Sequence, residues 1–392
     1  MKKPGGKLII IFFIILIFLS SVFSVSGLKQ KVTINDRYEY YTYSKMTSLL
    51  LDLQANYSDI MFLESIGKSY EDREIWMVKI SDNPTYNENE PGVLLMGAHH
   101  GNEKPSFEVL INFTKYLTDT YGKLDVDTDN DGSLNEDIID GRDNDNDGLT
   151  DEDPSEKRVK DIVDNTQIFI IPMVNPDGVE ADTRTNCNPV NVVNLNRNYD
   201  DPWKLYYLFP ALYGAPWLTN PGSFNYRGEY PFSELETQAI KSFVEQNDIN
   251  ISLSYHTYGE IIFFPWFHTT AKTPHEDFLI SVGENMTDIN NYELYIDRDY
   301  PIPLPGGTLG TSENWLYREH GILSYTMELC RTRAPTDPDI VEEYLLTHIG
   351  VNLYVCERAP TIQIDGPPKI RTRLESFSHV LSLLHQRFHR LF

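Results

Sequence analysis

The chain has 392 residues, of which 41% are hydrophobic, and a formal net charge of −25 at pH 7. This length and hydrophobic content exclude a disordered chain and allow one large domain or two smaller ones. The acidic balance argues against nucleic acid as a partner, because phosphate backbones are bound through Lys and Arg. Much of the charge is local, since 13 of the 58 acidic residues lie between 125 and 153.

The first 26 residues have the composition of a secretory signal peptide. Three lysines precede an apolar run from residue 8 to 19, and small residues follow as far as Gly27. This order predicts cleavage after Ser26 and a secreted or cell-surface protein. Alternatively, an uncleaved run that extends to Val25 would anchor the chain in a membrane.

Apolar strands alternate with amphipathic helices along most of the remaining chain. The hydrophobic periodicity predicts helices at 36–56, 105–116, 234–246, 312–320 and 342–354, and strands at 60–66, 74–81, 92–96, 166–174, 249–255, 261–265 and 322–329. Ser233 and Glu236 have the spacing of a capping box for the third helix. The alternation predicts a layered α/β fold with a mixed sheet, in one domain from residue 36 to 357.

The acidic segment 125–153 interrupts this domain as an insertion. It contains two D-x-D-x-D-G sequences, and alternating Asp with a turn Gly is typical of loops that bind calcium through oxygen atoms. Ile138 and Pro154 occupy the twelfth positions, so neither loop is an EF-hand, and both resemble the calcium loops of thrombospondin type 3 repeats. A solvated acidic loop is the alternative. The predicted Ca²⁺ ligands are Asp127, Asp129, Asp131, Asp137, Asp143, Asp145, Asp147, Asp151 and Asp153.

Residues 360–392 form a basic tail. Apolar residues between Leu374 and Phe388 recur near helical spacing, which predicts an amphipathic segment that contacts a membrane or a partner. A disordered or packed terminal helix is the alternative. The three cysteines of the chain, Cys187, Cys330 and Cys356, are too few for a disulfide scaffold and are predicted to be small buried residues.

Candidate metal ligands follow two of the predicted strands. His100 and Glu103 lie in GAHHGNE after the strand at 92–96, and His256 lies in SYHTYG after the strand at 249–255. The carboxyl ends of strands are where α/β sheets place their ligands. Zinc in hydrolases takes three nitrogen or oxygen ligands and leaves one position to water. His99, four residues before Glu103, is the alternative to His100.

Six short motifs occur in order along the chain: GAHHGNE, NPDG at 175–178, NLNRNYD at 194–200, PFSELET at 231–237, SYHTYG at 254–259 and YTMEL at 325–329. Over residues 36–357 the chain resembles zinc carboxypeptidases of the carboxypeptidase A and T type. The resemblance implies a mixed eight-stranded sheet flanked by helices, within a catalytic domain that covers 36–357. It also implies a zinc ion bound by His100, Glu103 and His256, and so favours His100 over His99.

The same resemblance implies roles for residues around the metal. Glu328 matches the general base that activates the zinc-bound water. Burying a carboxylate in an apolar strand costs free energy, which argues for a functional role. Arg184 matches the arginine that polarises the scissile carbonyl, although Thr183 replaces the aromatic residue usual before it. Asn196 and Arg197 match the pair that binds the terminal carboxylate of the substrate, which suits the bidentate geometry of a guanidinium.

Two further positions concern substrate binding. Tyr300 is the nearest candidate for the mobile tyrosine of the family, and requires an insertion before Trp315. Glu313 occupies a position that is acidic in enzymes that cut basic C-terminal residues, and a helix N-terminal glutamate facing solvent is the alternative. Asn102 stands where the family often has an arginine, a difference that affects a subsite rather than the chemistry.

The sequence therefore predicts a secreted, monomeric zinc carboxypeptidase that acts on the C-termini of peptides or proteins. One alternative is a zinc deacylase or amidase of the same fold, acting on small N-acyl amino acids. Another is a non-catalytic, calcium-dependent surface module. Asn196 and Arg197 favour the peptidase over the first alternative, and the presence of Glu328 with all three ligands argues against the second.

Overall fold

The computed structural model describes residues 37–123, 156–200, 216–266, 272–295, 309–362 and 364. The predictions for the signal peptide, the acidic insertion, Tyr300 and most of the basic tail lie outside these residues. The helices in chain order are α2 (Tyr43–Asn56), α3 (Pro105–Thr120), α4 (Glu156–Val163), α5 (Pro176–Glu180), η1 (Leu195–Arg197), α7 (Pro216–Thr219), α8 (Leu235–Val244), α9 (Glu276–Asn290), α10 (Ser312–Trp315), η3 (Leu316–His320), α11 (Pro338–Arg358) and η4 (Ala359–Thr361).

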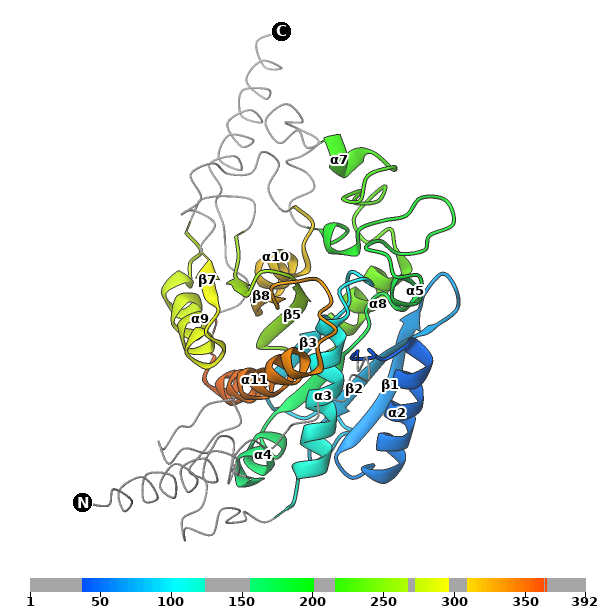
Figure 1. The fold of residues 1–392 in the computed structure, drawn as a ribbon. Coiled ribbons are helices and arrows are strands. Elements are labelled where there is room, and N and C mark those ends of the chain that lie inside the picture. Colours follow the sequence, from blue (N-terminus) through cyan, green and yellow to red (C-terminus); the bar gives the residue numbers. More distant parts are fainter. Residues whose placement is uncertain are drawn as a thin grey trace, which may run out of the picture. The chain divides into compact units, whose positions relative to one another are not determined.

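A mixed sheet of eight strands forms the centre of the fold (Figure 1). Its strands are β1 (Met61–Lys68), β2 (Glu74–Ile80), β3 (Gly92–Met96), β4 (Gln167–Ile171), β5 (Ile251–Thr257), β6 (Ile261–Phe263), β7 (Glu293–Tyr295) and β8 (Leu323–Leu329). They are arranged in the order β1-β2-β4-β3-β5-β8-β6-β7. The central strands β4, β3, β5 and β8 pair in parallel, whereas β1, β2 and β6 join antiparallel. The mixed eight-stranded sheet expected from the sequence is therefore confirmed.

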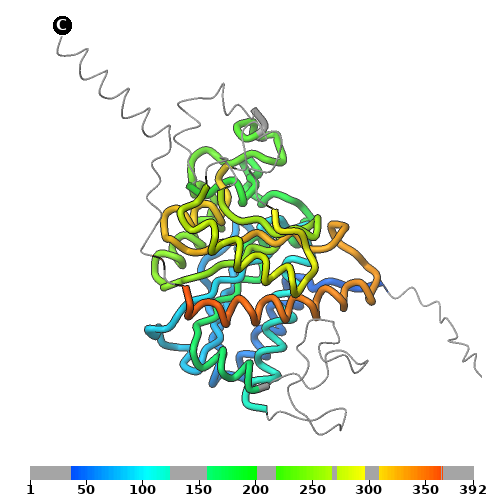
Figure 2. Tube along the Cα trace, turned by 90° about the vertical axis from the view of Figure 1, so that its left-hand side faces the viewer, coloured from blue at the N-terminus to red at the C-terminus, as the bar shows by residue number. Residues whose placement is uncertain are grey.

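Helices cover both faces of the sheet. Successive residues of a strand point to opposite faces, so neighbouring residues of β3 belong to different cores. Val93 and Leu95 pack in a core that includes residues of α2, α3, α4, α9 and α11. Leu94 and Met96 pack on the other side with residues of α8 and with Trp315 of α10. The 21-residue helix α11 packs against both α3 and α9, as Figure 2 shows. The central strands are buried on both faces, which explains why they are continuous apolar runs in the sequence.

The helix expected from residue 36 begins only at Tyr43, with Thr42 as its N-cap. The preceding residues instead form a strap that is held by tyrosine hydroxyls. Tyr38 Oη donates a hydrogen bond to Glu108 Oε1 of α3 at 2.6 Å, and Tyr40 Oη donates to the carbonyl of Pro335 at 2.6 Å. These long-range bonds prevent residues 38–42 from continuing the helix.

The predicted capping box is wrong. The helix α8 begins one residue later than the spacing predicts, with Glu234 as its N-cap and no side-chain cap. Ser233 Oγ donates instead to Glu234 Oε1 at 2.6 Å and accepts a hydrogen bond from Asn198 Nδ2 at 2.9 Å. A contact with a distant segment thus replaces the local cap.

Other predicted elements differ in extent. The strand expected at 166–174 ends at Ile171, and Asn175 then caps α5 by accepting a hydrogen bond from Gly178 N at 2.9 Å. The helix expected at 312–320 is α10 followed by the π-helical turn η3, and α11 is longer than predicted at both ends. Within the described part of the chain, no helix has the length and apolar character needed to span a bilayer. Cys330 and Cys356 are buried as expected, whereas Cys187 is partly exposed, and all three are free thiols.

Candidate active site

His100, Glu103 and His256 meet at the carboxyl ends of two adjacent strands. The strands β3 and β5 are parallel, with Met96 opposite Ser254, so the turn after β3 lies beside the end of β5. All three side chains are buried, and their nitrogen and oxygen ligand atoms lie within 4.8 Å of one another. The sequence placed His256 after its strand, whereas it lies within β5.

The neighbouring histidine, His99, stacks on His256 with ring centroids 5.6 Å apart, but it is not part of this group of ligand atoms. Its Nε2 lies 2.8 Å from Tyr199 Oη, and its Nδ1 lies 3.3 Å from Ser254 Oγ. Both ring nitrogens therefore have partners elsewhere. The structure thus places His100, and not His99, beside Glu103.

The geometry of the three residues fits a bound zinc ion. Glu103 bridges the two imidazoles, with Oε1 at 2.9 Å from His100 Nδ1 and Oε2 at 2.9 Å from His256 Nδ1. The two Nδ1 atoms are themselves 3.1 Å apart. Facing nitrogens at this distance share at most one proton, so a cation between them satisfies both lone pairs. Two nitrogens and a carboxylate are also the donor set that hydrolytic zinc prefers.

The electrostatics keep His100 neutral, as a metal ligand must be. Burial lowers the pKa of His100 to about 3, against the opposing charge of Glu103. Burial is the largest influence on the pKa of His256 and acts to lower it, but the hydrogen bond to Glu103 and the charges of Glu103, Glu328 and Glu313 together raise it. Burial alone would raise the pKa of Glu103, yet the charges and hydrogen bonds of the two histidines bring it well below its usual value.

Asn194 orients His100 from the other side of its ring. His100 Nε2 donates to Asn194 Oδ1 at 2.9 Å, and Asn194 is fully buried. Because one ring nitrogen carries the proton for this bond, the lone pair of the other nitrogen points toward Glu103 and His256. Sequence reasoning missed this residue, although it opens the NLNRNYD motif.

Glu328 lies on β8 directly beside His256 of β5, because the two residues are paired in the parallel register. Its Oε2 atom is buried and has no hydrogen-bond partner among the described residues. Burial raises the pKa of Glu328 to about 7, and the charges of Glu103 and Glu313 act in the same direction, while His256 and Arg184 oppose them. The carboxylate predicted as general base is therefore adjacent to the histidines and free to take a proton.

Arg184 reaches the site from its more exposed side. Its Nη1 donates to Glu103 Oε1 at 2.8 Å, and its side chain is 31% exposed. The guanidinium is therefore the part of this otherwise buried group that is accessible to solvent.

Asn196 and Arg197 lie in the turn η1 beside the site. Asn196 is buried, with Nδ2 at 3.2 Å from His256 Nε2, and its Oδ1 accepts a hydrogen bond from Ser312 N at 2.9 Å. Arg197 Nη1 donates to the carbonyl of Asn196 at 2.5 Å. Burial and the charge of Arg184 lower the pKa of Arg197 to about 10, against the charges of three nearby glutamates. The guanidinium remains a cation at neutral pH.

Gly310 allows this turn to pack against the segment that leads into α10. A β-carbon at Gly310 would lie 2.0 Å from the carbonyl oxygen of Arg197, and the residue has a φ of +78°. Both conditions require glycine. The close approach brings Arg197 next to α10.

Glu313 of α10 is buried rather than facing solvent, so the alternative interpretation of this residue is wrong. Its Oε1 accepts a hydrogen bond from Ser312 Oγ at 3.0 Å. Its Oε2 is buried and has no hydrogen-bond partner within the described ranges. The helix N-terminus is covered by protein, which explains why the surface interpretation fails. Tyr300 lies outside the described residues.

Two histidines and a glutamate, buried together at the carboxyl ends of two central strands, define the site of a metal-binding α/β protein. Residues 46–347 match the model of the zinc carboxypeptidase family. The chain therefore belongs to this family, whose members depend on zinc.

Comparisons with individual proteins agree with this assignment. A zinc carboxypeptidase from Saccharothrix mutabilis subsp. capreolus is 27% identical over 307 residues, which cover 74% of this chain and 62% of the relative. Carboxypeptidase D from Rattus norvegicus is 22% identical, over 77% of this chain and 20% of the relative. The chain thus spans less than two thirds of the length of these relatives.

Solved structures show the same fold. The crystal structure of thrombin activatable fibrinolysis inhibitor (TAFI) superposes with a TM-score of 0.63 and 19% identity, over 82% of this chain and 75% of the other. Carboxypeptidase A from Helicoverpa armigera superposes with a TM-score of 0.60 and 16% identity, over 90% of this chain and 82% of the other.

Proposed function

We propose that this protein is a zinc carboxypeptidase that removes the C-terminal residue of peptides or proteins. The observation that carries the proposal is the pairing of Glu328 with His256 across two adjacent strands, which sets a carboxylate with a free oxygen beside the three candidate ligands. Membership of the zinc carboxypeptidase family supports it.

Each residue of the site has a distinct part in the reaction. His100, Glu103 and His256 would hold a zinc ion, which would supply a Lewis acid for the substrate carbonyl and lower the pKa of water. Glu328 accepts a proton from the attacking water and passes it to the nitrogen of the leaving amine. Arg184, the solvent-accessible member of the group, donates hydrogen bonds to the carbonyl oxygen as negative charge develops there.

The restriction to C-terminal residues comes from Arg197. Its guanidinium binds the terminal carboxylate of the substrate in a bidentate pair. Asn196 adds a hydrogen bond to the same carboxylate when its Nδ2 leaves the 3.2 Å contact with His256. A charged group at this place favours substrates that end within the site over chains that continue through it.

Replacing the proposed base tests the mechanism. We expect Glu328→Gln to lower kcat by roughly 10²- to 10⁴-fold, because the amide does not accept the proton. Zinc content, measured by atomic absorption, should stay unchanged. The matched control is Glu284→Gln, an exposed position on α9, which should keep full activity. Near-normal turnover by zinc-loaded Glu328→Gln would remove Glu328 from the mechanism.

The peptidase and the deacylase alternatives differ in the substrates they release. Mass spectrometry on a panel of peptides should show sequential loss of C-terminal residues, and blocking the C-terminus as an amide should prevent it. Cleavage confined to small N-acyl amino acids, with no action on longer peptides, would favour the deacylase.

We also propose a preference for basic C-terminal residues, supported by Glu313. A buried carboxylate with an unpaired oxygen is unfavourable unless a cation pairs with it. A Lys or Arg side chain of the substrate supplies that cation. Glu313→Gln should therefore lower kcat/KM for substrates that end in Arg by about tenfold or more, while substrates that end in Phe change little. A hydrophobic preference in the unmodified protein would contradict the proposal.

The sequence supports three further parts of the proposal. Residues 1–26 direct export, so that the protein acts outside the cell or on its surface, where it is a monomer. Residues 125–153 bind calcium. The basic tail at 360–392 contacts a membrane or a partner. Sequencing of protein purified from culture medium should find Gly27 as the first residue. An intact Met1 in protein retained by the membrane would indicate an uncleaved anchor.

A further inference from the structure

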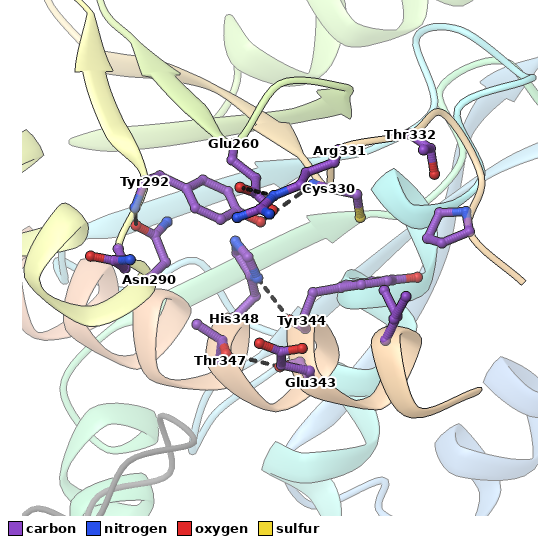
Figure 3. Close-up of a pocket in the computed structure, with 13 residues that line it drawn as sticks. Glu260, Asn290, Tyr292, Cys330, Arg331, Thr332, Glu343, Tyr344, Thr347 and His348 are labelled. Atoms are coloured by element: carbon purple, nitrogen blue, oxygen red, sulfur yellow. Dashed lines mark hydrogen bonds and ion pairs between the residues drawn. The ribbon is translucent and has the colours of Figure 1, made fainter. Parts of the chain in front are cut away.

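A pocket outside the candidate active site is lined by residues of α11 and of the turns that follow α9 and β8 (Figure 3). Side chains alternate along β8, so that Glu328 faces the histidines while Met327 and Leu329 join the core that contains α11. The pocket has a volume of about 380 Å³ and lies between α11, the turn that follows α9, and the turn after β8. This volume is typical of a site for a small ligand.

His348 of α11 supplies a free acceptor inside this pocket. It is 1% exposed, and its Nδ1 donates to the carbonyl of Tyr344 at 2.7 Å. Its Nε2 is buried and has no hydrogen-bond partner among the described residues. In Figure 3 the ring points from α11 toward Glu260 and Arg331, with the second nitrogen at its far end.

The protonation of His348 follows from its surroundings. Burial lowers its pKa to about 4, although the hydrogen bond to Tyr344 opposes the change. The ring is therefore neutral at pH 7, and its proton is on Nδ1, since a backbone carbonyl only accepts. The unpaired Nε2 is consequently an acceptor whose lone pair is unsatisfied.

The charges at the mouth of the pocket are mainly negative. Glu260 and Glu343 face one cation, Arg331, whose Nε donates to Glu260 Oε2 at 2.8 Å. Burial is the main reason that the pKa of Tyr292 is raised, and the charges of Cys330, Glu260 and Glu343 add to it. Arg331 is 85% exposed, so a ligand can compete with it in solvent.

Aromatic rings complete the walls. Tyr292 packs against His348 with ring centroids 5.3 Å apart, and Tyr344 lines the opposite part of the pocket. Asn290 is already occupied, because its Oδ1 accepts from Tyr292 N at 3.1 Å and its Nδ2 contacts Met327 Sδ at 3.4 Å. Of the described residues, no group of three metal-ligating atoms includes His348, so the pocket does not suit a metal ion.

We propose that this pocket binds a small organic cation, an ammonium or guanidinium group, through His348 Nε2 and the carboxylates of Glu260 and Glu343. An N–H group of the cation donates to His348 Nε2, the charges of Glu260 and Glu343 attract the cation, and the face of Tyr292 or Tyr344 contributes a cation–π contact. The cation takes the place of the Arg331 guanidinium beside Glu260. Binding here is independent of the metal and of the proposed carboxypeptidase reaction.

Isothermal titration calorimetry of the full, zinc-loaded protein with n-butylammonium chloride tests the proposal. We expect saturable binding at one site. Butanol lacks the charge and tetramethylammonium lacks N–H donors, so both should bind at least tenfold more weakly. Equal affinity for the three probes, or no binding of butylammonium, would overturn the proposal.

Variants then locate the site. Glu260→Gln combined with Glu343→Gln should weaken butylammonium at least tenfold, and His348→Phe should do the same if it folds. Arg331→Ala should strengthen binding severalfold, because it removes the competing cation. Arg331 is exposed, so this substitution does not disturb the buried core as His348→Phe can. Glu313→Gln is the control for binding in the proposed active site. Loss of binding in Glu313→Gln, with no effect of Arg331→Ala, would assign the cation to the active site instead.

Discussion

At the scale of single residues, Asn194 decides which nitrogen of His100 is available to a metal. Its carbonyl oxygen accepts the proton of Nε2, and its amide group is fixed in turn by Phe224 O at 3.2 Å and Asn225 Oδ1 at 3.3 Å. The ring therefore has one orientation and one tautomer before any metal arrives.

Loss of this hydrogen bond should weaken zinc binding. We expect Asn194→Leu to lower zinc affinity by roughly 10- to 100-fold, measured by competition with a chromophoric chelator. Asn194→Asp keeps an acceptor for Nε2 and should retain most of the affinity. Equal losses in both variants would show that packing, and not the hydrogen bond, is responsible.

The order of the motifs was sufficient to predict that His100, Glu103, His256 and Glu328 belong to one site. Asn194 was not predicted, because its role depends on a contact with a ring 94 residues earlier in the chain. For Glu313 the sequence left a buried and a solvent-facing position equally open, because a glutamate in the first turn of a helix satisfies the helix dipole whether it is exposed or covered.

At the scale of elements, the strap before α2 is joined to α3 through a buried carboxyl group. Glu108 accepts hydrogen bonds from Tyr38 Oη at 2.6 Å and from Tyr41 N at 3.3 Å. Burial raises the pKa of Glu108 to about 7, although these two hydrogen bonds oppose the shift. The folded protein therefore holds a proton here that the unfolded chain releases at its ordinary pKa of 4.5.

This difference predicts how stability changes with pH. Because the folded pKa is the higher one, the contribution of Glu108 is fully present below about 4.5 and is lost as the pH rises toward 7, by up to ~1.4 kcal/mol per pH unit. Glu108→Gln should remove this slope from the free energy of unfolding, measured in urea between pH 4.5 and 7. The exposed Glu284→Gln variant should keep it. An identical slope in Glu108→Gln would show that another group is responsible.

Elements were predicted well where the hydrophobic pattern decided them. The strand at 92–96 was correct to the residue, since it is buried on both faces. The predictions for the strap and for the start of α8 were wrong. These segments form hydrogen bonds with Glu108, Pro335 and Asn198, which lie in distant parts of the chain. Periodicity contains no information about such partners.

At the scale of the whole molecule, two metals are expected to have separate effects. The acidic segment 125–153 lies between α3 and α4 in the sequence, away from the motifs of the active site. Removing calcium with EGTA should lower the melting temperature by several degrees and leave activity at 25 °C nearly unchanged, since each kcal/mol corresponds to ~2–4 °C for 150–250 residues and to less for a longer chain. Phenanthroline should abolish activity.

The control for the calcium effect is a variant with Asp145→Asn and Asp147→Asn, whose melting temperature should no longer respond to EGTA. If calorimetry gives the same melting temperature with and without calcium in the unmodified protein, the segment is a solvated acidic loop.

The register between β5 and β8 has a consequence for how this protein can change over evolution. His256 and Glu328 are held in place by backbone hydrogen bonds between two buried strands, so mutations of surrounding side chains barely alter their separation. Glu313, by contrast, lies on a four-residue helix reached through the turn at Gly310. Selection, natural or in the laboratory, can therefore exchange this short segment and alter the proposed substrate preference while the residues of the proposed hydrolytic site stay unchanged.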